Sequence, residues 1–311
     1  MRAAALSLLL FAAANVANGQ AQNDTSTTSD APTGGWGSCT DVAHRRSAEQ
    51  EIAACTRVLD NTQAEMWRGA AFWWRGLAQK RAGQPTRAAE DFASALAAYS
   101  HYIEITPRSS EAYFQRGQLL AYLQRYDDAL RDYDAADRIA PNQIISHYGR
   151  GNIAFARGYY ALAISEFDAA QRTARLRSAS GALHMTDGAF SGRRFVGQTF
   201  DALRCQARAA AGAELDLAEQ VCDNAVRASN SDADALVARG FLRFKQGALE
   251  RAATDFAAAA QARPDFAAAL LGRGVTRLRA SDATGSADID RARALDGAAV
   301  ASFENAGLRA P

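Results

Sequence analysis

The sequence has no excess of charge of either sign, because 35 Lys and Arg residues are balanced by 34 Asp and Glu residues. Nucleic acids and anionic membrane surfaces attract proteins that carry a clear positive excess. We therefore expect neither of them as a partner of this chain.

Proline is scarce, with 6 residues among 311, and runs of Val, Ile and Thr that would form strands are absent. Alanine instead fills long stretches, and it has the highest helix propensity of all residues. Beyond the N-terminal region, no segment holds the roughly 20 apolar residues that a transmembrane helix needs. The composition predicts an all-α chain whose mature form has no membrane span.

Candidate catalytic groups are few and scattered. The four histidines, His44, His101, His147 and His184, lie far apart, and no Cys-x-x-Cys pair with a nearby His offers the spacing of a metal site. Acidic pairs recur with the helical period and are typical of a solvated helix face. We therefore expect no catalytic residues, no cofactor, no metal and a protein that is not an enzyme.

The N-terminus has the pattern of a secretory signal peptide at residues 1–19. Arg2 supplies the positive charge, residues 3–14 form an apolar run, and a small-residue cleavage site follows at 17–19 or 19–21. The alternatives are an N-terminal anchor and a buried helix. Residues 20–36 are polar and lack hydrophobic periodicity, which predicts a disordered leader. Export of this kind would place the mature protein in the periplasm or outside the cell.

A spaced pattern of small and large residues recurs in the rest of the chain. Counted from Ser110, positions 4, 8, 11, 20, 24, 27 and 32 hold Tyr113, Gly117, Leu120, Ala129, Tyr133, Ala136 and Pro141. A second unit, residues 233–266, repeats six of these positions with Leu236, Gly240, Ala252, Phe256, Ala259 and Pro264. Small residues let two antiparallel helices approach closely, and the large ones fill the remaining space.

This spacing resembles the 34-residue tetratricopeptide repeat. The resemblance implies a right-handed α-solenoid of tandem helix-turn-helix repeats. We expect a divergent helical hairpin at 37–68, three repeats at 69–177, an insert at 178–198, three repeat-like units at 199–299 and a cap at 300–311. In the first repeat the closing Pro107 comes seven residues late, which predicts a second helix that is two turns longer.

The stretches around Cys205 and Cys222, and the segment IAACTRVLD at 52–60 with Cys39 upstream, are similar to a group of tetratricopeptide proteins that alphaproteobacteria export. The resemblance covers nearly all of residues 37–311. It implies a helical scaffold and no particular activity.

Four cysteines in an exported chain favour disulfides. Cys39 and Cys55 are 16 residues apart and Cys205 and Cys222 are 17 apart, so each pair would straddle one hairpin. We predict the bridges Cys39–Cys55 and Cys205–Cys222. Buried free thiols that pack as small hydrophobic residues are the alternative.

In the repeat family that the chain resembles, positions 2, 5, 9, 12 and 13 of each first helix line a concave groove. The corresponding residues here are Trp73, Leu77, Lys80, Arg81, Glu111, Phe114, Gln118, Tyr122, Tyr148, Asn152, Phe155, Phe241, Phe244 and Lys245. Aromatic side chains interleaved with polar ones suit an extended or helical peptide. The alternative is that several of them pack against the neighbouring repeat.

The sequence thus leads to the hypothesis of a non-enzymatic periplasmic scaffold or adaptor that binds a protein or peptide partner through this groove. A structural, self-associating repeat module is an alternative. A remote alternative is an enzyme with its site in the insert, where the only titratable groups are His184, Asp187, Arg193 and Arg194.

Overall fold

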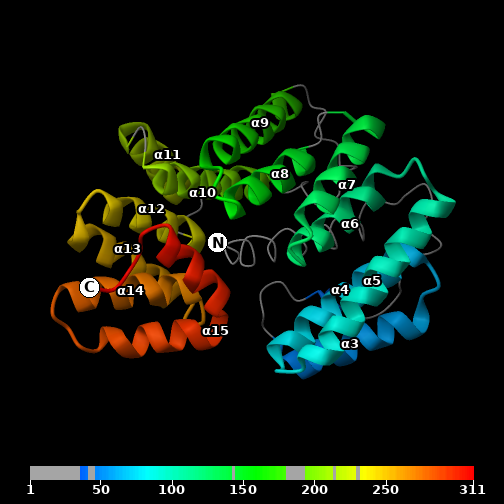
Figure 1. The fold of residues 1–311 in the computed structure, drawn as a ribbon, viewed down its shortest axis with the longest axis horizontal. Coiled ribbons are helices and arrows are strands. Elements are labelled where there is room, and N and C mark those ends of the chain that lie inside the picture. The colour runs from blue at the N-terminus through cyan, green and yellow to red at the C-terminus, as the bar shows by residue number, and fades with distance from the viewer. Residues whose placement is uncertain (1–35, 41–45, 142–143, 180–192, 213–214, 229–231) are drawn as a thin grey trace. The chain divides into compact units, whose positions relative to one another are not determined.

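The computed structural model describes residues 36–40, 46–141, 144–179, 193–212, 215–228 and 232–311. Every regular element in these ranges is an α-helix, and successive helices form antiparallel hairpins (Figure 1). The predicted all-α repeat fold is confirmed. The chain divides into two compact units, which are described separately.

The N-terminal unit comprises residues 8–149 and 176–191, as far as they are described. Its helices are α2 (Trp36–Cys39), α3 (Ala48–Asn61), α4 (Glu65–Arg81), α5 (Pro85–Ile105), α6 (Ser110–Tyr122), α7 (Tyr126–Ile139) and the start of α8 (Ile144–Ala156). Several helix starts follow from local sequence. Ser47 and Gln50 form a capping box on α3, Pro85 is the first residue of α5, and the Ser109 hydroxyl accepts a hydrogen bond from the backbone of α6.

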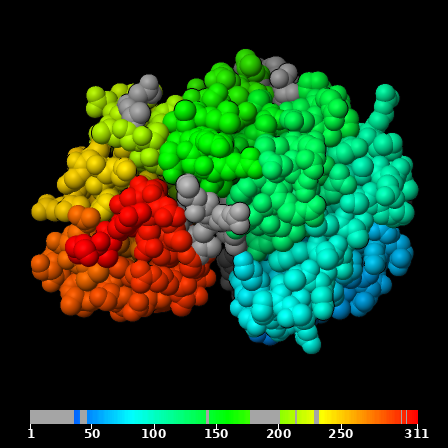
Figure 2. All heavy atoms as spheres, viewed as in Figure 1, coloured from blue at the N-terminus to red at the C-terminus, as the bar shows by residue number. Residues whose placement is uncertain are grey.

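The C-terminal unit comprises residues 150–175 and 192–311, as far as they are described. It holds the rest of α8, the helix α9 (Tyr160–Ala179) as far as residue 175, and the helices α10 (Arg193–Ala211), α11 (Leu215–Ala228), α12 (Ala233–Lys245), α13 (Leu249–Ala262), α14 (Ala267–Arg279) and α15 (Gly285–Asn305). Asp296 has a non-helical backbone that breaks α15 into two parts. The end of the chain, red in Figures 1 and 2, lies against the orange and yellow helices of the same unit.

Several helix bounds differ from the expected division of the chain. Trp36, assigned to the leader, begins α2 and is buried, because its ring packs edge-on against Trp67 at 4.9 Å between centroids. The expected insert starts inside α9 and ends inside α10, and residues 180–192 between them lie outside the described part. The expected border at 299 falls within α15. The signal peptide and most of the leader also lie outside the described residues.

Five of the described hairpins are packed around a glycine of the first helix, namely Gly76, Gly117, Gly151, Gly240 and Gly274. A Cβ on Gly117 would lie 2.9 Å from the Tyr133 ring, and one on Gly240 would lie 3.0 Å from the Phe256 ring. Both rings are completely buried. The predicted pairing of a small residue at position 8 with a large one at position 24 is therefore confirmed, because the ring occupies the volume that a side chain on the glycine would need.

The turn between the two helices of a hairpin contains one residue with positive φ. Gly83, Gly158 and Gly247 have φ values of 72°, 79° and 77°. Gln124 and Ser281, with φ values of 61° and 63°, occupy the same repeat position without being glycine. This conformation ends the first helix, as predicted for Gly247.

The second helix of the first full hairpin is longer than the one that follows it. The helix α5 has 21 residues, whereas α7 has 14. The difference of seven residues equals two helical turns and confirms the interpretation of the late Pro107.

An arginine and a carboxylate tie the two helices of most hairpins together. Arg116 of α6 donates two hydrogen bonds to Asp132 of α7, at 2.8 and 2.7 Å. Equivalent two-pronged contacts join Arg75 to Asp91, Arg239 to Asp255 and Arg273 to Asp288, and Arg150 lies 3.5 Å from Glu166. Planar guanidinium–carboxylate pairs of this kind fix geometry as well as charge.

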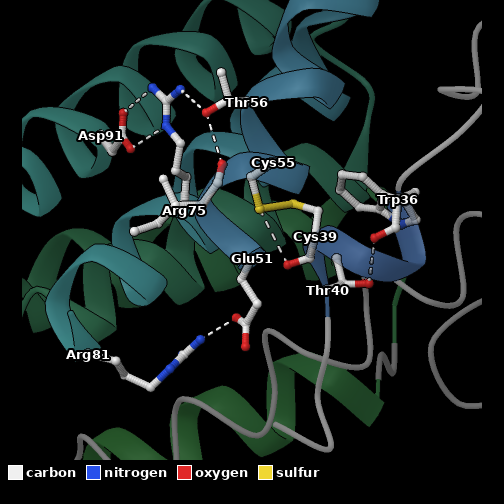
Figure 3. Close-up of a disulfide and its surroundings, with 10 residues drawn as sticks. Trp36, Cys39, Thr40, Glu51, Cys55, Thr56, Arg75, Arg81 and Asp91 are labelled. Atoms are coloured by element: carbon white, nitrogen blue, oxygen red, sulfur yellow. Dashed lines mark hydrogen bonds and ion pairs between the residues drawn. A yellow bond between two sulfur atoms is a disulfide. The ribbon is translucent and has the colours of Figure 1, made fainter. Parts of the chain in front are cut away.

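Two disulfides tie the remaining hairpins, and both predicted pairings are confirmed. Cys39 is bonded to Cys55 and Cys205 to Cys222, with Cα–Cα distances of 4.5 and 4.8 Å. The first bridge joins the single-turn helix α2 to α3, close to the pair formed by Arg75 and Asp91 (Figure 3). All four sulfur atoms are therefore consumed in bridges.

Candidate partner-binding site

The predicted groove residues on α4 are divided between buried and exposed positions. Trp73 and Leu77 are 2% and 3% exposed. Lys80 and Arg81 reach solvent at the end of the helix, where Arg81 forms an ion pair with Glu51 (Figure 3). The indole Nε1 of Trp73 is buried and has no hydrogen-bond partner within the described residues.

On α6, the predicted residues Phe114, Gln118 and Tyr122 are all buried. The Lys80 ammonium donates a hydrogen bond to the Tyr122 hydroxyl at 3.2 Å and lies 5.3 Å from the centre of its ring. Consecutive repeats thus bring a cation and an aromatic ring together. The Oε1 atom of Gln118 is buried without a hydrogen-bond partner in the described part of the chain.

The predicted residues on α8 belong to different units. Tyr148 of the N-terminal unit is 4% exposed. In the C-terminal unit, Asn152 is 1% exposed, and neither atom of its side-chain amide has a hydrogen-bond partner among described residues. Phe155 is buried and packs against the Tyr160 ring at 5.3 Å between centroids.

The predicted residues on α12 are in contact with the end of the chain itself. The Phe241 ring meets the Phe303 ring edge-on, with 5.6 Å between centroids. Lys245 donates a hydrogen bond to the backbone carbonyl of Ala306 at 3.2 Å. Phe244 lies beneath the Arg279 guanidinium, 4.9 Å from its ring centre. These residues form a surface that is already covered by a helical segment of the same protein.

Burial changes the ionisation of groups beside the predicted groove. The Glu111 carboxyl, at the start of α6, has a raised pKa because burial disfavours its charged form. Gln115 donates a hydrogen bond to this carboxyl at 2.7 Å, which acts in the opposite direction. Burial also raises the pKa of Tyr99, and the neighbouring Glu111 contributes to this shift.

The described residues contain no group of three or more His, Cys, Asp and Glu side chains arranged to hold a metal ion. Within the same residues, no helix is long and apolar enough to cross a membrane. Of the groups considered for an enzymatic insert, His184 and Asp187 lie outside the described part, and Arg193 and Arg194 begin α10.

Sequence reasoning missed the arginine that precedes each packing glycine. An Arg-Gly pair stands at 75–76, 116–117, 150–151, 239–240 and 273–274. The recurrence of the Arg-Gly doublet could have identified this arginine, but the repeat pattern accounts only for its glycine. The structure shows that its arginine also reaches back to the preceding repeat, since Arg116 donates a hydrogen bond to the Ser100 hydroxyl at 3.1 Å.

Antiparallel helical hairpins whose first helices begin 34 residues apart, at Ser110 and Ile144 and again at Ala233 and Ala267, define a helical-repeat protein. Residues 74–144 match the family described as tetratricopeptide repeat. This part of the chain therefore consists of tetratricopeptide repeats, and the other described helices form hairpins of the same kind. No curated protein matches its sequence.

Solved structures with the same fold include yeast Tom70, with 16% identity and a TM-score of 0.58, covering 98% of this chain and 69% of that one. A tetratricopeptide repeat protein from Parabacteroides merdae has 16% identity and a TM-score of 0.52, with coverage of 87% and 96%. PilW, a type IV pilus biogenesis factor, has 15% identity and a TM-score of 0.52, with coverage of 76% and 97%. At these identities the likeness concerns the fold alone.

Proposed function

We propose that this protein is an exported, non-enzymatic scaffold that binds a protein or peptide partner through the first helices of its repeats. The fold supports an interaction scaffold, because stacked helical hairpins present long, rigid surfaces to other chains. The observation that carries the proposal is a set of buried polar atoms without partners on these helices, among them Trp73 Nε1 and Gln118 Oε1 in the N-terminal unit.

A buried polar atom without a hydrogen bond destabilises a fold by about 1–3 kcal/mol. Trp73 carries a hydrogen-bond donor and Gln118 an acceptor, and a peptide backbone supplies the complement of both. Because both atoms are buried, binding of this kind requires the two side chains to rearrange and expose them. The nearby Lys80 and Tyr122 add a cation and an aromatic ring, which suit anchoring side chains of a peptide.

Location in the periplasm is part of the same proposal. The N-terminal signal pattern supports it, and the two disulfides are compatible with an oxidising compartment. Sequencing the N-terminus of protein recovered from the envelope fraction tests it, with a start near residue 20 expected. A start at Met1 would refute cleavage.

The binding proposal is tested by capturing partners with purified protein after crosslinking. Gln118→Met removes a polar atom while nearly conserving volume, and we expect unchanged or slightly higher stability because this atom has no partner in the described part. Trp73→Phe also removes a polar atom, but its smaller ring loses packing in the core, so some loss of stability is expected. Partner affinity should fall by about fivefold to tenfold per variant, the value of one hydrogen bond of about 1 kcal/mol.

Trp74→Phe is the matched control, because Trp74 is a buried tryptophan of the same helix that the proposal does not use. Equal capture by the wild type and all three variants would show that these polar atoms do not contact a partner. If the chain captured only copies of itself, the self-associating module would replace the scaffold.

A further inference from the structure

The last helix of the chain consists of two parts with different roles. Its first part closes the hairpin with α14, because Arg273 donates two hydrogen bonds to Asp288, at 2.8 and 2.6 Å. A Cβ on Gly274 would lie 2.7 Å from Ile289. Ile289 thus packs where an aromatic ring packs against the corresponding glycine of other repeats. The repeat is therefore complete before the break at Asp296, where φ is −155° and ψ is 83°.

The part beyond the break begins and ends by its own signals. The Asp296 carboxylate accepts a hydrogen bond from the backbone N–H of Ala299 at 2.9 Å, which is the geometry of a helix N-cap. At the other end Gly307 has a φ of 109°, and the Leu308 N–H donates to the Phe303 carbonyl at 2.9 Å. This contact is typical of a helix ended by a glycine. Residues 297–305 thus form a short helix with its own start and stop, and residues 306–311 follow it without regular structure.

This short helix covers the surface formed by Phe241, Phe244 and Lys245 of α12 and Arg279 of α14, called here the α12/α14 face. Val300 and Phe303, one helical turn apart, and Leu308 beyond the turn are buried in the core of the C-terminal unit. Lys245 and Arg279 donate hydrogen bonds to the carbonyls of Ala306 and Arg309, at 3.2 and 3.4 Å. Cations at this end also match the negative end of the helix dipole. Figure 2 shows the red end of the chain lying against the yellow and orange part of the C-terminal unit.

We propose that the α12/α14 face is a binding surface for a short amphipathic helix, and that residues 297–311 are its resident occupant. An external ligand for this face is a helix with apolar residues three positions apart whose carboxyl end meets Lys245. It competes with the resident segment for the same contacts. The proposal rests on the proposed function only for the existence of that external ligand.

Two features make the occupant exchangeable. The polar contacts from Lys245 and Arg279 go to the backbone carbonyls of Ala306 and Arg309, just beyond the helix end, and a backbone carbonyl is present whatever the side chain. The Arg273–Asp288 ion pair and the packing that complete the last repeat lie before Asp296, while a single described side-chain ion pair, Arg293 to Glu304 at 2.9 Å, joins the first part of α15 to the segment. Departure of the short helix therefore leaves the hairpin of α14 and α15 closed.

The first measurement is native-state hydrogen exchange on the full chain. We expect amides of 299–306 to exchange at least tenfold faster than those of α12, through an opening that leaves α12 protected. Exchange at the same rate in both segments would show that the short helix opens only with the whole unit, and would overturn the proposal.

The second measurement uses a labelled peptide of residues 297–311 as the probe. Phe303→Ala combined with Leu308→Ala in the full chain weakens the resident segment, and the peptide should bind this variant at least tenfold more tightly than the wild type. Leu295→Ala, an exposed apolar residue before the break, is the control and should leave binding unchanged. Adding Lys245→Met to the double variant should reduce peptide binding severalfold.

Equal peptide binding by the wild type and the double variant would overturn the proposal. Should the double variant fail to fold, the exchange measurement on the wild type decides alone. Neither measurement involves an external partner, so its failure is distinct from failure of the capture experiment with Trp73→Phe and Gln118→Met.

Discussion

The hairpins α6/α7 and α10/α11 are closed at the same level by different chemistry. In α6/α7, Arg116 and Asp132 form a two-pronged ion pair, whereas in α10/α11 Cys205 and Cys222 form a disulfide. Arg116 and Cys205 each occupy the seventh position of their repeat. The separation of 16 residues between Arg116 and Asp132 also equals that between Cys39 and Cys55. In both hairpins the seventh position of the repeat is thus cross-linked to the second helix, and either an ion pair or a disulfide can form this cross-link.

The ion pair and the disulfide differ in the number of helices that they connect. Arg116 contacts Asp132 of its own hairpin and Ser100 of the preceding helix, so it couples neighbouring repeats. A disulfide joins only two residues. In α10 the contact with the preceding helix is made instead by Arg204 and Arg208, which both form ion pairs with Asp168 of α9. In α10/α11 the disulfide therefore joins the two helices of the hairpin, and separate arginines contact the preceding helix. In α6/α7, Arg116 alone makes both kinds of contact.

Removal of the disulfide should have the largest effect. Cys205→Ala with Cys222→Ala is expected to destabilise α10 and α11 by about 3 kcal/mol, the chain-entropy value for a loop of about 15 residues. Native-state hydrogen exchange of the amides of these two helices measures it. Cys39→Ala with Cys55→Ala is the comparison, and it should free mainly the four-residue helix α2. An equal loss of protection in α4 and α5 would contradict this local role.

Breaking the ion pair should have the next largest effect. Asp132→Ala leaves Arg116 partly buried without its carboxylate. Loss of one partner of a fully buried pair costs about 3–5 kcal/mol, and because the Arg116 side chain is 24% exposed we expect about 2–3 kcal/mol. Urea unfolding measures this change.

Asp128→Ala is the matched control for the ion pair. Asp128 pairs with Arg125, the N-cap residue of the same helix, whose side chain is 55% exposed, and solvent screening should make the loss of stability much smaller than in Asp132→Ala. A similar loss in Asp128→Ala and Asp132→Ala would mean that position in the hairpin does not matter.

Two carboxyl groups, Glu111 in the N-terminal unit and Asp168 in the C-terminal unit, should contribute to stability with opposite dependence on pH. Burial raises the pKa of Glu111, so its charged form is disfavoured in the folded N-terminal unit. The folded unit then holds the proton more tightly, and its stability falls as pH rises above about 4.5. In the C-terminal unit, burial alone would raise the pKa of Asp168, but hydrogen bonds from Arg208 and Arg204 hold it below its ordinary value. That contribution is lost as pH falls below about 4.

Hydrogen exchange of α6 and α10 amides, corrected for intrinsic rates, separates the two pH responses. Glu111→Gln should remove the dependence in α6 and leave that in α10 unchanged. Parallel pH profiles for both helices in the wild type would contradict the opposite signs.

Much of the fold could be predicted because it depends on residue size at fixed spacing. The contact of Gly117 with Tyr133, the longer α5 and the pairing of the cysteines follow from residue spacing. The carboxylate partners were harder to find, because the residue that meets the arginine is Glu166 in one repeat and Asp288, 15 rather than 16 residues away, in another. The segment that covers Phe241 and Lys245 has no repeat periodicity, so no spacing rule could place this segment on them.

The smallest effect is expected in the turns, where the sequence varies at a fixed conformation. Gln124 has a φ of 61°, which strains a residue with a side chain by about 1–2 kcal/mol, whereas glycine loses about 0.5–1 kcal/mol through its greater freedom when unfolded. Gln124→Gly should therefore stabilise the α6/α7 hairpin by about 0.5 kcal/mol. The reverse change, Gly83→Gln, should destabilise α4/α5 by a similar amount, because a Cβ there meets nothing within 4 Å and adds only the backbone strain. Thermal unfolding of both variants measures the difference, and a shift of the same sign in the two would show that side-chain contacts, rather than the left-handed backbone, determine the stability of these turns.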